Sequence, residues 1–283
     1  MPEMKKYLYI LAAVLLSTGC FHDFHEKMDG HGQLAVSLQW ALSEDAGTCV
    51  HNLAYAIAGT GTSFTQFFAG PAQASSELLL LPAGEYDILV TANMTRADGY
   101  AVEGLPVTKA GAGLSDIPAS LQDPASSPEQ AWYAFTHVNV QEGGVTVAPL
   151  QLKRLLATMD VDIDNIPAGT KMDMDIASVA QSVNLVSGAP STDSKVVSHS
   201  AGRINILPTA AGVERFLLTL TLTTPDGNTL TVEGNVPRAD VGKTYTLEMD
   251  YNTLQPYMNF SAGEIGPWGE KWTVSGEILN PRN

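Results

Sequence analysis

The sequence predicts an all-β protein built from two antiparallel β-sandwiches. Apolar and polar residues alternate strictly over many short stretches, and turns rich in Gly and Pro separate these stretches. In Gln33–Ala41, for example, Leu34, Val36, Leu38 and Trp40 fall on one face of an extended chain. No segment repeats its apolar residues at the helical period over three turns. Many short strands separated by turns indicate sandwiches.

The first half of the chain carries seven apolar or alternating stretches. Pro82-Ala83-Gly84 is a turn signal between two of them. Residues 96–130 are rich in Gly, Ala, Ser, Pro and Asp, so we expect a long excursion there, with a short helical piece near Pro128–Gln130. The seven stretches are Gln33–Ala41, Asn52–Ala58, Phe64–Phe68, Glu77–Leu81, Glu85–Asn93, Trp132–Gln141 and Val145–Leu150.

A second set of strands follows a boundary near Leu150–Arg154. Pro225-Asp226-Gly227-Asn228, between two alternating runs, is a specific hairpin signal. We predict a signal peptide (1–19), a tether (20–31) and two sandwich domains (32–152 and 153–283). The predicted strands are Leu155–Ile163, Ala180–Val186, Arg203–Leu207, Arg215–Thr224, Thr229–Val236, Thr244–Tyr251 and Lys271–Leu279.

The N-terminal segment has the features of a lipoprotein signal peptide. Lys5 and Lys6 precede the apolar run Tyr7–Leu16, which is about half as long as a membrane-spanning helix requires. Ser17-Thr18-Gly19-Cys20 follows and resembles the lipobox of bacterial lipoproteins, in which the cysteine thiol is acylated and the signal is cut before it. We therefore expect Cys20 to carry lipid that attaches the protein to a membrane. An ordinary secretory signal with a chance cysteine is the alternative.

The mature chain is strongly acidic. The full sequence has 15 Lys and Arg against 30 Asp and Glu; without residues 1–19 these become 13 and 29, a net charge of −16. Such a chain lacks the basic patch that nucleic-acid binding requires, so we expect no nucleic-acid partner. With Cys20 acylated, Cys49 is left without a disulfide partner, and we expect a small buried residue. A reactive thiol paired with His51 is the alternative.

We find no enzyme motif in the sequence and expect no catalytic residues, no cofactor and no metal. Asp160, Asp162 and Asp164 alternate as at the start of a calcium loop. Asn165 and Lys171 stand where that loop needs Gly and Glu, so we expect the solvated face of a strand instead.

Five short segments resemble the fimbrillin-like lipoproteins of Bacteroidales, and more narrowly the anchor and accessory subunits of type V pili. They are Gly32–Trp40, Leu81–Val90, Leu152–Ala157, Arg203–Thr209 and Gly242–Leu247. The resemblance implies two transthyretin-like or Ig-like β-sandwich domains on a lipoprotein of the outer membrane, at the cell surface. It also implies that the partners are other pilus subunits, joined by complementation, in which an extended strand fills a partner's sheet edge.

The chain departs from the stalk subunits of that family, which lose their first strand by cleavage after a basic residue. No Lys or Arg lies between Lys27 and Arg96, so such a cut cannot remove Gln33–Ala41. We therefore expect an anchor or accessory subunit that keeps both its lipid and its first strand. The expected assembly residues are Leu34, Val36, Leu38 and Trp40 in the first strand and Trp272, Val274 and Ile278 in the last.

A surface glycan-binding lipoprotein of a nutrient-uptake system is the alternative function. Trp268 and Trp272 are the candidate platform, with Trp132 as a further candidate, because an aromatic face with flanking acids suits a sugar ring. Core packing is the commoner use of isolated tryptophans and is the competing interpretation for these residues.

Overall fold

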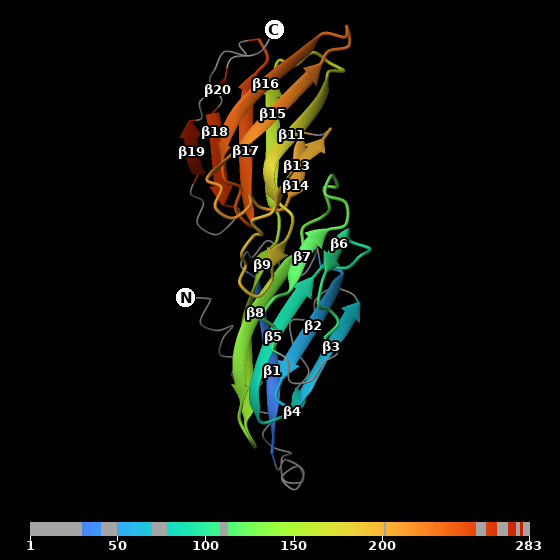
Figure 1. Cartoon of the computed structure of the whole chain (residues 1–283), viewed down its shortest axis with the longest axis vertical. Helices are drawn as coiled ribbons and strands as arrows, with labels where there is room; N and C mark the ends of the chain where they lie inside the picture. The colour runs from blue at the N-terminus through green and yellow to red at the C-terminus, as the bar shows by residue number, and fades with distance from the viewer. Residues whose placement is uncertain are drawn as a thin grey trace, which may run out of the picture.

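The computed structural model describes residues 30–40, 50–69, 78–107, 113–200, 202–252, 259–264, 271–275 and 278–279. Within these ranges the regular structure is β-strand throughout, which confirms the predicted all-β class. No described helix has the length and hydropathy needed to cross a membrane. Figure 1 shows an elongated molecule, with the strands before residue 155 at one end and most later strands at the other.

The first half of the chain forms a seven-stranded sheet. Its strands are β1 (His31–Trp40), β2 (Asn52–Gly59), β3 (Thr62–Ala69), β4 (Leu79–Pro82), β5 (Gly84–Ala92), β8 (Trp132–Val140) and β9 (Val145–Arg154). The order across the sheet is β3-β2-β5-β8-β9-β1-β4. Neighbours are antiparallel except for β1 and β9, which run parallel. All seven predicted stretches therefore lie in this one sheet.

The second half forms two five-stranded sheets. One has the order β14-β10-β17-β18-β19 and the other β13-β11-β15-β16-β20. The strands of the first sheet are β10 (Ala157–Asp164), β14 (Arg203–Ile206), β17 (Lys243–Asp250), β18 (Asn259–Glu264) and β19 (Lys271–Ser275). Those of the second are β11 (Lys171–Ala180), β13 (Ser194–His199), β15 (Arg215–Thr223), β16 (Thr229–Pro237) and β20 (Ile278–Leu279).

The predicted hairpin between β15 and β16 is confirmed. The two strands pair along their whole length, from Arg215 opposite Pro237 to Thr223 opposite Thr229. Gly227 closes the turn with a φ of 83°, a left-handed conformation that glycine adopts without steric cost. The sequence signal worked because all the information for this turn is local.

The long segment between β5 and β8 contributes two strands to a three-stranded sheet. β6 (Tyr100–Val102) and β7 (Pro118–Leu121) pair with each other, and β7 also pairs with β12 (Val183–Asn184). This β7–β12 contact is the one strand pairing, among the described residues, that joins the two halves. The predicted strand Ala180–Val186 is thus reduced to β12. The predicted division into domains 32–152 and 153–283 stays a prediction.

The helical piece expected near Pro128–Gln130 is wrong. These residues form neither helix nor strand, and their carbonyls and side chains bond to residues distant in the sequence. The Pro128 carbonyl accepts a hydrogen bond from Nδ2 of Asn205 at 2.9 Å. The Gln130 side chain binds both the N–H and the C=O of Leu156, at 2.8 and 3.2 Å.

Two hydrophobic cores lie on opposite faces of the seven-stranded sheet. Alternation along β5 shows the division, since Ile88 and Val90 belong to the smaller core and Leu89 to the larger one. The smaller core draws its buried residues from positions 34–152. The larger core runs from the first half into the second, up to Leu247.

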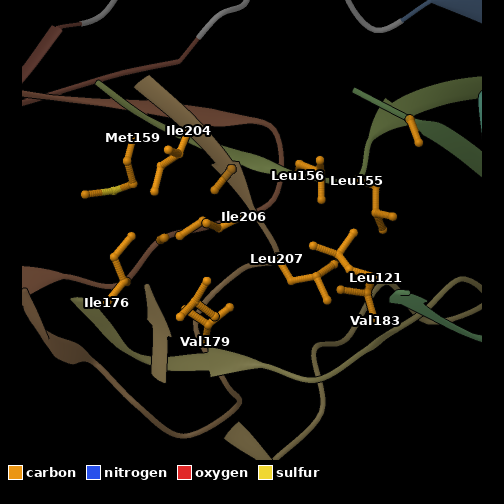
Figure 2. Packing of buried hydrophobic residues seen from close by; sticks show 14 of the residues in the cluster. Leu121, Leu155, Leu156, Met159, Ile176, Val179, Val183, Ile204, Ile206 and Leu207 are labelled. Carbon is orange, nitrogen blue, oxygen red and sulfur yellow. The ribbon is translucent and has the colours of Figure 1, made fainter. Parts of the chain in front are cut away.

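Leucines fill the junction between the halves. Leu155 and Leu156, between β9 and β10, are fully buried. Figure 2 shows Leu121 of β7 and Val183 of β12 beside them, with Leu207 between this group and the interior of the second half. The larger core is therefore shared, and the two halves bury apolar surface against each other.

Candidate functional site

The first predicted assembly strand, β1, is an integral part of the sheet. Leu34, Val36 and Leu38 are buried in the smaller core, as their alternation predicts. Trp40 packs edge-to-face against Trp132, with 5.9 Å between the ring centroids. Paired aromatic rings of this geometry stabilise a fold beyond simple burial. Removing β1 would therefore open the smaller core along much of its length.

An exposed apolar patch flanks the beginning of β1. Gln33 of β1 is paired with Leu80 of β4 on one side and with Val145 of β9 on the other. Directly paired residues face the same side of a sheet. Leu78, Leu80, Val145 and Val147 are 54%, 55%, 55% and 58% exposed. We call these four residues the apolar patch; the continuous apolar run ending at Leu81 was its only signal in the sequence.

The last predicted assembly strand is divided between two sheets. Trp272 and Val274 lie on β19, opposite Ala262 and Phe260 of β18. Ile278 lies on β20, which pairs with β16. Among the described strands, β19 and β20 each stand at the edge of a sheet with a single neighbour. The C-terminal segment thus supplies an edge to both five-stranded sheets.

Several predicted residues lie outside the described ranges. Cys20, Cys49 and Trp268 are among them, so the lipid anchor, the buried thiol and the sugar platform stay predictions. His51 is described, and its Nε2 lies 2.6 Å from a carboxylate oxygen of Asp98.

Asp98 is the centre of a hydrogen-bond cluster. Its carboxylate also accepts bonds from Nδ2 of Asn52 at 2.9 Å, and from the N–H and hydroxyl of Thr95 at 2.9 and 2.5 Å. Burial raises the pKa of this carboxyl, but the bonds from Thr95, His51 and Asn52 outweigh it and lower the pKa to about 2. Asp98 therefore fastens the start of β2 to the turn after β5.

His137 on β8 bridges two carboxylates of β5. Its Nδ1 lies 2.7 Å from Asp87 and its Nε2 lies 2.6 Å from Glu85. The bonds to Asp87 and then to Glu85 raise the pKa of His137 above its ordinary value. Asp87 also accepts a bond from the N–H of Leu114 at 2.7 Å.

The alternating aspartates lie on β10, with Asp162 and Asp164 exposed, as the predicted solvated face requires. Asp160 lies 3.7 Å from Arg203. In the part of the chain that the structure describes, no three His, Cys, Asp or Glu residues are grouped so as to hold a metal ion.

A pocket that sequence reasoning missed opens over β2, β3 and β5. Its volume is about 270 Å³. Phe67 and Tyr100 contribute aromatic surface, and Asn52, Thr95 and Arg96 contribute polar groups. These residues come from four separate segments, so no local pattern could have brought them together.

Comparison with protein families identifies a match over most of the chain. A model of the fimbrillin-A associated anchor proteins Mfa1 and Mfa2 matches residues 51–273. A comparison with curated proteins found no match.

Three solved structures share the fold. A candidate polysaccharide-binding protein of Bacteroides thetaiotaomicron is 14% identical, with a TM-score of 0.59, over 84% of this chain and 100% of that one. A candidate adhesin of the same organism is 11% identical, with a TM-score of 0.60, over 87% and 98%. A candidate adhesin of Bacteroides ovatus is 10% identical, with a TM-score of 0.55, over 87% and 95%. At these identities the likeness concerns the fold alone.

Proposed function

The chain belongs to the family of fimbrillin-A associated anchor proteins, and from this premise we propose that it is an anchor or accessory subunit of a cell-surface fimbria. The family match over residues 51–273 carries the proposal, because it includes strands of all four sheets. The role is structural: the subunit holds other subunits, and no catalysis is needed for that. Cys20 attaches it to the outer membrane through lipid.

The proposed assembly uses the two ends of the molecule (Figure 1). At one end the apolar patch lies on either side of β1, where a partner subunit's strand can extend the sheet beside β4 while the rest of the partner covers the exposed Leu and Val. At the other end β19 and β20 are sheet edges that have one described neighbour each. Patches of exposed apolar side chains on a sheet favour association, because burying them removes apolar surface from water.

The lipid anchor is tested by exchanging the two cysteines separately. We expect the wild type and a Cys49→Ser variant to incorporate a labelled fatty acid and to sediment with membranes. A Cys20→Ala variant should do neither. Labelling of the Cys20→Ala variant would overturn the anchor, whatever the role in a fimbria.

The assembly face is tested by placing charge on it. We expect the amount of fimbrial subunits that co-purifies with a double variant, Leu80→Lys with Val147→Lys, to fall about tenfold or more. The reason is that burying an unpaired charge costs free energy. All changed positions are more than half exposed, so the fold should persist. Val196→Lys on β13, at 62% exposure, is the matched control and should retain its partners. Equal co-purification of both variants would contradict this face.

A further inference from the structure

The pocket over β2, β3 and β5 combines an aromatic wall with a polar one. Phe67 of β3, Ala54 of β2 and Thr91 of β5 are paired in one row across the three strands and line it. Tyr100 of β6 also lines the pocket, and its hydroxyl donates to the carbonyl of Glu129 at 2.5 Å. The Tyr100 hydroxyl is therefore already used, and its ring gives the pocket an apolar side.

Phe67 stands at the mouth of this pocket with 62% of its surface exposed. Its sequence neighbour Phe68 behaves differently, since it packs edge-to-face on Tyr55, with 5.1 Å between the ring centroids. The Phe67 ring thus remains available to a ligand that enters the pocket. An exposed ring beside a hollow is suited to stacking against the flat apolar face of another ring.

Arg96 supplies a positive charge at the same pocket. It is the only Lys or Arg between Lys27 and Lys109 in a chain with a net charge of −15. Within the described residues its guanidinium has no ion-pair partner. The neighbouring carboxylate of Asp98 is bound to other groups instead. An unpaired guanidinium presents several N–H donors in a fork that matches a carboxylate.

The hydrogen bonds to Asp98 determine which donors and acceptors of Asn52 and Thr95 remain free to bind a ligand. Asn52 gives its amide N–H to Asp98, which leaves its carbonyl oxygen as an acceptor. The Thr95 hydroxyl donates to Asp98 and likewise remains an acceptor. The turn carrying Arg96 is fixed by its own backbone, because the Tyr100 N–H donates to the Thr95 carbonyl at 3.0 Å. The site is therefore preorganised, with two acceptors and one cationic donor lining the same pocket.

We propose that this pocket binds a single acidic sugar residue of a glycan, such as a uronic or sialic acid. Sugar hydroxyls donate to Asn52 and Thr95, the sugar carboxylate binds Arg96, and the ring stacks on Phe67. The volume of about 270 Å³ is small beside the ~300–1,000 Å³ of sites for drug-sized ligands, which suits one sugar ring. An acidic peptide side chain would satisfy Arg96 but would leave the acceptors of Asn52 and Thr95 without donors.

The test measures binding of defined oligosaccharides to the purified full chain by calorimetry. Sialyllactose and a glucuronic-acid-terminated tetrasaccharide are the acidic probes, lactose is the neutral one, and a tripeptide with a free carboxylate represents peptides. We expect at least one acidic sugar to bind about tenfold or more tightly than lactose, because a charge-assisted bond to Arg96 adds to stacking.

Two variants separate the two walls of the site. Arg96→Gln should abolish the preference for acidic sugar. Phe67→Ala should lower the affinity for the acidic sugar by about 2- to 12-fold. Arg215→Gln, which removes another exposed arginine, is the control and should change nothing. The proposal is overturned if acidic sugars bind no better than lactose, if Arg96→Gln keeps the preference, or if only the tripeptide binds. None of these results bears on whether the chain joins a fimbria.

Discussion

The junction between the halves allows a quantitative prediction. Leu156 is fully buried in the core that both halves share, and its backbone is held at both polar groups by the Gln130 side chain. We expect Leu156→Ala to lower the free energy of unfolding of both halves together. The reason is that its side chain packs where the first half meets the second (Figure 2).

The expected loss is about 3 kcal/mol. Truncation removes three carbon atoms, worth about 2.4 kcal/mol at ~0.8 kcal/mol per buried CH₂, and the remaining cavity adds to this within the usual ~2–5 kcal/mol. The cavity cannot collapse easily, because Leu155 beside it is buried as well and Gln130 fixes the backbone.

Urea unfolding can be monitored by hydrogen-exchange mass spectrometry. Peptides from β5 then report the unfolding of the first half, and peptides from β15 report that of the second. In the wild type both sets should lose protection at the same urea concentration, and in Leu156→Ala both should shift together to lower urea. Leu217→Ala, at a position 37% exposed, is the control and should cost about 1.5 kcal/mol, because the part of its side chain already in water contributes nothing. Separate transitions in the wild type, or a shift of one half alone, would refute the shared core.

Three further predictions concern single side chains of the first half. Because the pKa of Asp98 is depressed, its carboxylate stabilises the fold at pH values above its ordinary pKa of 3.8, and this stability is lost as the pH falls toward about 2. Asp98→Asn should remove this part of the acid dependence of the free energy of unfolding, on the order of 2 kcal/mol, as measured by urea titrations at several pH values. NMR titration should give His137 a pKa above the ordinary value of 6.5, and Asp87→Asn should lower this pKa more than Glu85→Gln does. The stability that the His137 bonds contribute is fully present below pH 6.5 and is lost as the pH rises through the raised pKa. Tyr86→Phe should cost about 1–3 kcal/mol in the same urea assay, because the buried hydroxyl lies 2.9 Å from both the Thr60 and the Pro82 carbonyl oxygens.

Local patterns predicted much of the fold. β1 followed from the alternation of its buried residues, and the β15–β16 hairpin followed from a turn that requires Gly227. Five strands, β6, β7, β11, β13 and β18, were missed, and in two of them the patterns are broken. In β11 the register shifts between Ile176 and Val179, with Ser178 in a left-handed conformation, and β13 has few apolar residues.

Long-range contacts explain what the sequence could not predict. The pairing of β7 with β12 joins positions more than sixty residues apart, such as Ala119 and Val183. The helical piece was wrong for the same reason, since distant residues satisfy the backbone near Pro128. The pocket of Phe67 and Arg96 is assembled from separate segments, and the expected platform at Trp268 and Trp272 gave no indication of it.

The most direct test of a fimbrial role is mass spectrometry of fimbriae purified from crosslinked native cells. We predict that this chain is present in them, at fewer copies than the main subunit, and that its mature N-terminus is acylated Cys20. Its intact first strand should be recovered as a peptide that includes Gln33–Ala41. Absence from fimbriae, with recovery only beside outer-membrane transporters and glycan-degrading enzymes, would contradict the account and favour a role in glycan capture.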